Sequence, residues 1–371
     1  MPALYNVLLT NSTDIYAGGE FYVLQLATAL QARGHRVWVC CRPGNMLRVK
    51  CEQARVPTIP LDFPPQGQLP RFVGSLKKII QRQQVQIVHT NSNYDRTAGA
   101  FAARLTGAKH VTNVHSFHSL RYNVTHWLRN SWATDHFIVD GVCVRDVLVQ
   151  KDRIPSSKIS VVYLGVDPEE MKRDESGRVS VREKLGYRPE NIVIGNVARL
   201  VPFKGHEYLL KAFAGLYVMF PKVRLLLIGD GELRQDLAKL AEDLGILPQV
   251  TFAGFRDDLT LVYSAFDVYV HPSIEGGGET FPFAVLQALA QELPVVVTRV
   301  GDVAEMVVDG VNGFAIPEKE PSALAEHVAR LVENNSLRAL MGQRSRELLL
   351  RRFTTGQMVD GVEMIYRSVA R

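Results

Sequence analysis

The feature that most constrains the fold of this 371-residue chain is an alternation of short apolar runs with longer amphipathic segments. The alternation extends through residues 5–163, is interrupted, and starts again at residue 192. Strands that alternate with helices are typical of parallel sheets flanked by helices. Two such sets predict an α/β protein with two Rossmann-like, doubly wound parallel-sheet domains. The chain is also longer than a single domain with one hydrophobic core usually is, which agrees with this prediction.

A charged and polar stretch over residues 167–180 lies between the two sets and has the composition of a linker. We therefore expect an N-terminal domain over residues 1–168 and a C-terminal domain over residues 169–354. The remaining segment, 355–371, has the apolar spacing of an amphipathic helix.

Short apolar runs predict the strands, and segments of 3.6-residue periodicity predict the helices. The expected strands are 5–10, 37–40, 87–89, 111–114, 136–139, 160–163, 192–195, 224–228, 250–252, 267–270, 295–298 and 313–316. The expected helices are 21–33, 69–83, 96–105, 117–132, 141–151, 206–219, 232–244, 321–333, 336–351 and 355–369, with a further one after residue 282.

The charge is divided unevenly between the two halves. Residues 1–168 hold 19 Lys and Arg against 10 Asp and Glu, whereas residues 169–371 hold 24 against 28. A basic half favours an anionic partner. Because no nucleic-acid-binding module accompanies it, we expect contact with an anionic membrane surface and not with nucleic acid.

Two segments combine apolar and basic residues as interfacial helices do, 69–83 and 117–132. For 69–83 an ordinary surface helix with its apolar stripe on the sheet is the preferred interpretation. For 117–132, which is rich in aromatic residues and arginine, a membrane or lipid-acceptor role and an ordinary helix both stay open.

The chain is expected to work in the cytoplasm, with peripheral contact at the inner face of the membrane. It contains no run of about 18 apolar residues that would suggest a spanning helix. Its start shows no basic leader or small-residue cleavage site. The four cysteines, at positions 40, 41, 51 and 143, lack paired metal-ligand spacing, so reduced, mostly buried thiols are expected.

A glycine-rich loop over residues 276–278 joins a predicted strand to a predicted helix. Pro282 suits the first helical turn, where its missing N–H has no intrahelical partner. The free amides and the dipole of such a helix end favour anionic groups. Glu279 and its loop are therefore expected to face a phosphate site.

Two further loops follow strands of the same domain. Arg199 and Lys204 follow its first strand, and the glycines at 229 and 231 follow the second. In open sheets ligands lie beyond the carboxyl ends of the strands, and an Arg/Lys pair suits a diphosphate. The convergence of these loops predicts an anion site. Asp257 and Asp258 are expected only to cap the helix that follows them.

The loop after the first strand of the chain carries Gly18 and Gly19 but lacks the Gly-x-Gly-x-x-Gly pattern of dinucleotide-binding enzymes. A dehydrogenase is accordingly disfavoured. No Asp-x-Asp motif, Ser-His-Asp or Cys-His arrangement is apparent in the sequence, so neither a metal site nor a protein nucleophile is expected.

Several motifs together resemble the family-four retaining glycosyltransferases of the GT-B fold. They are residues 198–205, 227–233, 252–254, 271–273, 279–290, 293–298 and 308–314, with 162–167 and the glycines at 18 and 19 extending the match into the first domain. The resemblance implies a cleft between two Rossmann-like domains and a C-terminal helix that crosses back onto the first.

The resemblance also implies transfer of a sugar from a UDP- or GDP-linked donor to a glycan or lipid-linked acceptor, with retention, without a metal and without a cofactor. It places Glu279 against the donor sugar, Arg199 and Lys204 against the diphosphate, and His115 near the sugar from the first domain. His118 and His271 are assigned structural positions. The remaining residues expected to contact the donor are Gly18, Gly19, Gly229, Gly231, Thr280, Phe281, Gln287 and Glu305.

Two positions depart from the family pattern. Gln287 stands where the family has the acid that holds the ribose hydroxyls, and Pro282 where glycine is frequent. A glutamine can still hydrogen-bond a diol, although without charge. Two other interpretations stay open: a non-catalytic sugar-nucleotide-binding protein and a sugar-nucleotide epimerase of the same fold.

Overall fold

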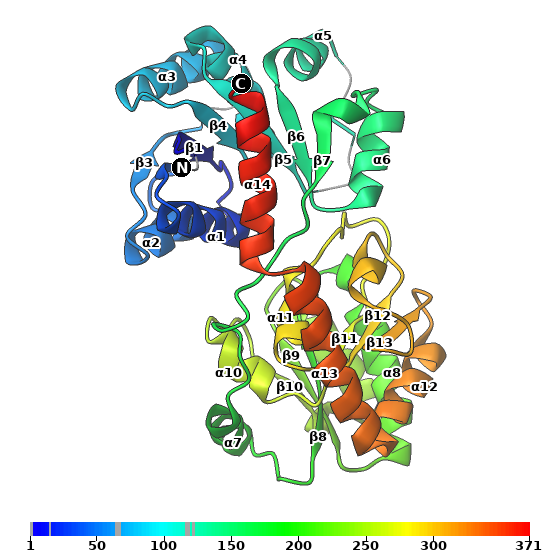
Figure 1. Ribbon diagram of the computed structural model, residues 1–371. Helices are drawn as coiled ribbons and strands as arrows, with labels where there is room; N and C mark the ends of the chain where they lie inside the picture. The colour runs from blue at the N-terminus through cyan, green and yellow to red at the C-terminus, as the bar shows by residue number, and fades with distance from the viewer. Residues whose placement is uncertain (1–2, 15, 64–67, 116–118, 121–122) are drawn as a thin grey trace. The chain divides into compact units, whose positions relative to one another are not determined.

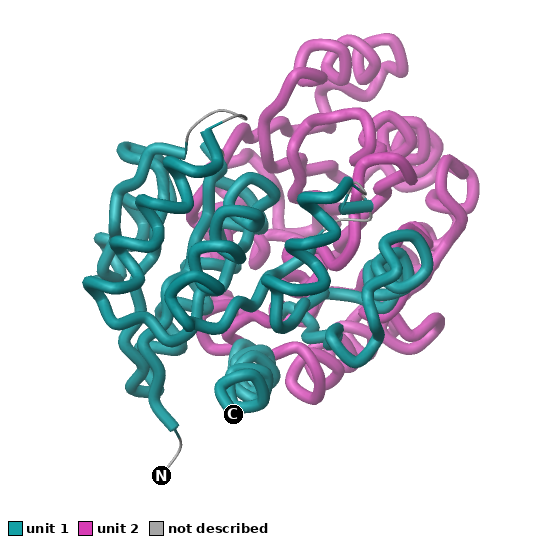
Figure 2. Tube along the Cα trace, turned by 90° about the horizontal axis from the view of Figure 1, so that it is seen from above, with its two compact units in different colours: residues 1–164, 355–371 teal, residues 165–354 magenta. Residues whose placement is uncertain are grey.

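The computed structural model describes residues 3–14, 16–63, 68–115, 119–120 and 123–371. The chain forms two compact units, one from residues 1–164 together with 355–371 and the other from residues 165–354 (Figure 2). Each unit contains one parallel sheet flanked by helices and has its own apolar core (Figure 1). The α/β class and the two Rossmann-like sheets expected from the sequence are confirmed.

The sheet of the first unit has the order β3-β2-β1-β4-β5-β6-β7. Its strands are β1 (Asn6–Thr10), β2 (Arg36–Cys41), β3 (Thr58–Pro60), β4 (Ile87–Thr90), β5 (Lys109–Val114), β6 (His136–Val139) and β7 (Ile159–Val161). The order reverses between β1 and β4, which is the switch point of a doubly wound sheet, where ligand-binding crevices form.

The helices of the first unit connect these strands or follow the second unit. They are α1 (Gly18–Ala32), α2 (Met46–Gln53), α3 (Leu69–Arg82), α4 (Asn93–Thr106), α5 (Val124–Leu128), the π-helical turn Arg129–Ala133, α6 (Val142–Gln150), the 3-10 turn Ser156–Lys158 and α14 (Thr355–Val369). The strand β3 and the helix α2 were not expected from the sequence. In the described part of 117–132, α5 and the π-helical turn lie where one helix was expected.

Helix α1 begins three residues earlier than the sequence predicted. The carboxylate of Glu20 accepts a hydrogen bond from the amide of Ala17 at 2.8 Å and so caps the first turn. Gly18 and Gly19 therefore lie in that turn and not in the preceding loop. The first amides of a helix lack intrahelical acceptors, so the two glycines keep the kind of position that suits an anion.

The apolar stripe of α3 is buried. Phe72, Leu76 and Ile80 pack into the core beside α4, while the basic residues lie on the other side of the helix. The ordinary surface helix expected for this segment is thus confirmed.

Helix α14 belongs to the first unit although it is the last element of the chain, and it packs beside α1 (Figure 1). The hydroxyl of its buried Tyr366 lies 2.7 Å from Nδ1 of His89, at the centre of the sheet. Its Glu363 accepts from His35 at 2.9 Å and pairs with Arg33 at 3.2 Å. These long-range polar contacts fix the returning helix to the first sheet.

The sheet of the second unit has the order β10-β9-β8-β11-β12-β13. Its strands are β8 (Ile192–Val197), β9 (Val223–Ile228), β10 (Val250–Phe252), β11 (Val268–His271), β12 (Val295–Thr298) and β13 (Gly313–Ile316). Its helices are α7 (Glu175–Lys184), α8 (His206–Met219), α9 (Arg234–Asp243), α10 (Leu259–Ser264), α11 (Phe283–Ala290), α12 (Pro321–Glu333) and α13 (Asn335–Arg352), with 3-10 turns at Pro202–Lys204, Leu247–Gln249 and Val303–Met306.

The first boundary between the units lies at residue 164, four residues before the expected one. Val166 already belongs to the second unit, because its amide bonds the carbonyl of Phe353 at 3.0 Å and the residue forms a bridge with Thr354.

The segment 167–180 is not a plain linker, because α7 begins within it. Asp174 caps this helix by accepting from the amide of Gly177 at 2.9 Å. Arg178 and Arg182 then each bind Asp267 at 2.6 Å, immediately before β11. The charges that suggested a solvated connection are instead used to attach α7 to the sheet.

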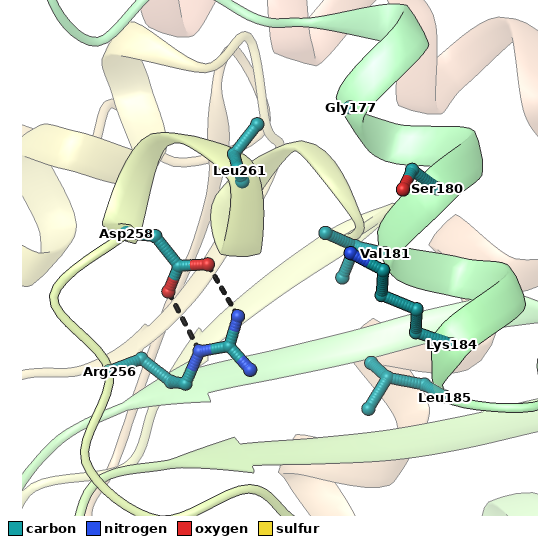
Figure 3. A pocket seen from close by; sticks show the side chains of 8 residues that line it. All are labelled: Gly177, Ser180, Val181, Lys184, Leu185, Arg256, Asp258 and Leu261. Atoms are coloured by element: carbon teal, nitrogen blue, oxygen red, sulfur yellow. Dashed lines mark hydrogen bonds and ion pairs between the residues drawn. The ribbon is translucent and has the colours of Figure 1, made fainter.

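A hollow lies between α7 and α10 and is lined in part by Arg256, Asp258 and Leu261 (Figure 3). Both carboxylate oxygens of Asp258 accept from the guanidinium of Arg256, with Nε at 2.7 Å from Oδ1. Asp258 precedes α10 but makes no side-chain hydrogen bond to its amides. The capping role expected for Asp258 was therefore wrong, since the nearby guanidinium takes up its carboxylate.

None of the helices in the described part of the chain combines the length and the apolar character needed to cross a bilayer.

Candidate functional site

A buried carboxylate marks the site at the carboxyl ends of the strands of the second unit. Glu279 is 9% exposed, and three groups bind its Oε2 atom. Lys204 forms an ion pair with it, Nε2 of His271 lies at 3.0 Å, and Oγ of Ser273 donates to it at 2.9 Å. Burial of a charge is costly unless the charge is paired and hydrogen-bonded, as it is here.

The ionisation of Glu279 follows from these contacts. Burial alone would raise the pKa of its carboxyl, but the charge of Lys204 and the hydrogen bond from His271 outweigh burial and hold the pKa well below its usual range. The group is thus an anion at any ordinary pH. None of the described residues hydrogen-bonds Oε1, so this oxygen is the one able to accept from a ligand hydroxyl.

His271 is part of the site, although the sequence analysis assigned it a structural position. The hydroxyl of Tyr269 lies 3.3 Å from its Nδ1, and Oγ of Ser273 lies 3.1 Å from its Nε2. Burial lowers the pKa of His271, which keeps the ring neutral. Because the ionised carboxylate of Glu279 can only accept, the proton of the neutral ring is on Nε2 and points at Glu279. His118 lies outside the described residues.

The two cations predicted for an anion site lie on the same loop but differ in surroundings. Arg199 is exposed, whereas Lys204 is partly buried against Glu279. Both face the ring of Phe203, at 5.9 Å for the guanidinium carbon and 5.4 Å for Nζ. The backbone of Gly277 packs so closely on this ring that a Cβ atom there would lie 1.9 Å from it. Phe203 therefore links the cationic loop to the glycine-rich loop.

Gly229 and Gly231 allow two loops to touch. Their φ angles are +128° and +159°, and a Cβ atom would lie 2.0 Å and 2.5 Å from the carbonyl oxygens of Ala198 and Leu200, respectively. The amide of Gly229 donates to Gly254, and that of Gly231 to the side chain of Asp230, both at 2.8 Å. In this structure the glycines bring the loops together and their amides are already bonded.

The residues after Glu279 lie mostly inside the protein. Thr280 and Phe281 are buried, and the Phe281 ring packs edge-on against Phe353 with ring centres 5.4 Å apart. Pro282 is the N-cap of α11 and not in its first turn, because its ψ of 125° is extended and the helix begins at the next residue. Gln287 is 5% exposed in the second turn of α11.

Glu305 lies on the 3-10 turn Val303–Met306. The amide of Asp302, just before this turn, bonds the carbonyl of Thr280 at 3.1 Å, which holds the turn beside the Glu279 loop. The Glu305 carboxylate pairs with Arg352 at 3.4 Å. Glu305 thus lies near the Glu279 loop, and its ion-pair partner Arg352 belongs to the same unit.

A second polar group lies at the carboxyl edge of the first sheet. Nδ1 of His115 is 3.2 Å from the carboxylate of Asp140, which directly follows β6, and the ring meets Tyr22 edge-on at 5.1 Å. A carboxylate at Nδ1 fixes the tautomer of an imidazole, and Nδ2 of Asn113 lies 3.5 Å from Nε2 of the ring. Asp140 was missed in the sequence, although its place after a strand was a usable signal.

Two family models match the chain. The model of glycosyl transferases group 1 matches residues 178–348, and that of glycosyltransferase family 4 matches residues 16–170. Together they account for most of both units. The chain belongs to the group 1, family 4 glycosyltransferases. The resemblance found in the sequence is confirmed.

Relatives of this glycosyltransferase cover most of its length. The putative glycosyltransferase EpsD of Bacillus subtilis is 28% identical over 349 residues, which are 90% of this chain and 89% of the relative. UDP-Gal:alpha-D-GlcNAc-diphosphoundecaprenol alpha-1,3-galactosyltransferase of Escherichia coli is 27% identical over 309 residues, 79% of this chain and 78% of the relative.

Solved structures match the whole glycosyltransferase. HepE of Anabaena, crystallised in complex with UDP, has a TM-score of 0.86 at 23% identity and covers 98% of this chain and 100% of its own. A glycosyltransferase of Rickettsia africae has a TM-score of 0.88 at 20% identity, covering 99% of each chain. The fold is GT-B, as the sequence resemblance implied.

Proposed function

We propose that this glycosyltransferase moves a sugar from a nucleotide diphosphosugar to a hydroxyl of a glycan or lipid-linked acceptor, with retention and without a metal. The observation that carries the proposal is the anionic Glu279, held through Oε2 by Lys204, His271 and Ser273. Such a fixed carboxylate suits the donor sugar, whose hydroxyls would donate to Oε1.

Charge stabilisation on the leaving group drives the proposed reaction. The bond from the anomeric carbon to the diphosphate oxygen breaks, and a bond to the acceptor oxygen forms on the same face. The acceptor proton passes to the departing phosphate, so no protein nucleophile is needed. Arg199 is exposed for contact with the diphosphate, and Lys204 lies on the same loop.

The names of two similar proteins favour a uridine donor. HepE was crystallised with UDP, and the E. coli relative is named for a UDP-linked galactose. That relative is also named for a diphosphoundecaprenol-linked acceptor, which supports a lipid-linked acceptor and a role in assembling cell-envelope polysaccharide here. We place the protein in the cytoplasm, in peripheral contact with the inner face of the membrane.

A nucleotide-release assay tests the proposal. Purified protein is offered a panel of UDP- and GDP-sugars, with and without simple glycoside acceptors, in the presence of a chelator. We expect release from a UDP-sugar, retention in the product by NMR, and loss of release in Glu279→Ala. Binding of UDP by calorimetry without release from any donor would instead support a non-catalytic binding protein.

A further inference from the structure

An exposed apolar surface lies on α4, α5 and the π-helical turn of the first unit. We call it the tryptophan surface. It consists of Leu105 of α4, Val124, Trp127 and Leu128 of α5, and Trp132 of the π-helical turn. Their exposed fractions are 59%, 76%, 50%, 38% and 50%. Large apolar side chains gathered in this way mark an interaction site more often than scattered ones do.

The Trp132 ring and the backbone of Trp127 are held by neighbouring residues. Trp132 packs beside Phe101 of α4, with ring centres 6.5 Å apart, and the guanidinium of Arg104 lies 5.0 Å from its ring centre. Ser131 bonds the carbonyl of Trp127 at 2.6 Å. A cation stacked on an aromatic ring is a stable arrangement, so the exposed edge of Trp132 has a fixed direction.

Buried and half-buried cations attach the same segment to the unit. The guanidinium of Arg129 is buried and bonds Thr97 of α4 at 3.2 Å. Lys158 closes the end of the π-helical turn by donating to the carbonyls of Ser131 and Thr134, both at 3.0 Å. The surface is thus a rigid part of the unit, which reduces the entropy lost when it binds.

The charge around the tryptophan surface is mainly positive. The sequence has no Asp or Glu between Asp95 and Asp135, a stretch that includes the rest of α4, α5 and the π-helical turn. Arg104 and Lys109 are among the basic residues of that stretch, and Asp135, whose carboxylate accepts from the amide of His110 at 2.8 Å, is the acid at its end. Half-exposed tryptophans beside an excess of cations match the interfacial layer of an anionic bilayer, where indole rings lie at the level of the headgroups.

We propose that the tryptophan surface is where this protein docks on an anionic membrane. This proposal locates the peripheral membrane contact that is part of the proposed function. It rests on that contact alone and not on the sugar-transfer reaction. Residues 116–118 and 121–122 of the segment lie outside the described residues and form no part of the surface as defined here.

Binding of the protein to vesicles tests this. Vesicles of phosphatidylcholine with or without phosphatidylglycerol are sedimented with the wild type at low and high salt. We expect binding to the anionic vesicles only, weakened by salt. Trp127→Ser with Trp132→Ser should reduce binding at least tenfold. Arg104→Gln should reduce it about fivefold, the amount expected for one basic residue near the surface.

The matched control changes two exposed apolar residues of the second unit, Val218→Ser with Met219→Ser, at 82% and 57% exposure. It should bind like the wild type. Nucleotide release and the melting temperature of the tryptophan variant show whether it is folded, and neither depends on vesicles. Full vesicle binding by the folded tryptophan variant would overturn the proposal. A wild type that does not bind anionic vesicles would also overturn the proposal. This includes the case in which sedimentation velocity shows a dimer formed through the tryptophan surface.

Discussion

Lys204 and Glu279 are joined in a largely buried ion pair although 75 residues separate them in the sequence. The lysine expected to neutralise a diphosphate is therefore also the counter-ion of the carboxylate expected to face the sugar. A diphosphate that approached this loop would compete with Glu279 for the same ammonium group, which couples binding of the phosphates to the position of the carboxylate.

Replacing the two cations separately should distinguish their roles. Lys204→Ala leaves a buried carboxylate without its charge partner and should cost about 3–5 kcal/mol of stability. Arg199→Ala removes an exposed side chain and should leave stability within about 0.5 kcal/mol. Both should lose about 2–4 kcal/mol of transition-state stabilisation. Denaturant titration measures the free energy of unfolding, and a turnover assay measures the loss of transition-state stabilisation. Equal stability of the two variants would contradict the prediction that Lys204 contributes more to stability than Arg199 does.

Glu279→Gln should abolish transfer while UDP still binds in calorimetry, because the amide cannot supply the negative charge. It should also lower stability at neutral pH. The folded pKa of Glu279 lies below its ordinary value of 4.5, so its contribution is present above that pH and is lost as the pH falls. The difference in melting temperature between wild type and variant should therefore be constant near neutral pH and should disappear in acid. A gap that widens in acid would contradict the assignment.

His271 should act by positioning Glu279. A hydrogen bond to a charged group contributes about 1.5–3 kcal/mol, so we expect His271→Phe to lower kcat about ten- to hundredfold. Tyr269→Phe, which removes only the hydroxyl at Nδ1, should have a smaller effect of the same kind. In both, the affinity for UDP should stay near that of the wild type. A fall in UDP affinity with kcat unchanged would mean that His271 serves the nucleotide and not the carboxylate.

Asp140→Asn should impair turnover through His115. The amide can present an N–H to Nδ1 and so favour the wrong tautomer of the ring. If His115 contacts the donor sugar, His115→Ala and Asp140→Asn should reduce turnover by similar factors, and the double variant should be no worse than either. Turnover of the three variants completes the cycle. Additive losses would show that the two residues act independently.

Gln287→Glu restores the acid that the family has at this position. A charge-assisted hydrogen bond is roughly twice as strong as a neutral one, so UDP should bind about fivefold more tightly. Inorganic diphosphate, which lacks a ribose, is the control ligand and should bind unchanged. Unaltered UDP affinity in calorimetry would show that Gln287 does not contact the ribose.

The sequence was sufficient for most of the parallel strands and for the family, because apolar periodicity and motif order are local properties. It was insufficient wherever a tertiary contact decided the outcome. Residues 167–180 were interpreted as a linker because nothing in the sequence shows that Arg178 and Arg182 bind Asp267 in the folded protein. The same limit applies to Asp258, which caps nothing once Arg256 binds it.

The residues of the site also divide into those that the sequence predicted and those that depend on tertiary contacts. Glu279, Lys204 and Arg199 were found from residue type and loop position, but the ion pair between the first two joins loops that meet where Phe203 packs on Gly277, which is a tertiary contact. His271 was assigned a structural position. Only the turn of the chain between His271 and Glu279 brings its Nε2 to the carboxylate.

The return of α14 to the first unit has a consequence for synthesis of the chain. A ribosome completes residues 165–354 before it makes the helix that covers His89 and pairs with His35. Domains usually fold in the order in which they emerge. Here the C-terminal unit can finish first, while the N-terminal sheet keeps part of its surface exposed until residues 355–371 leave the exit tunnel. Chaperone dependence of this protein should therefore arise from its earliest-made half.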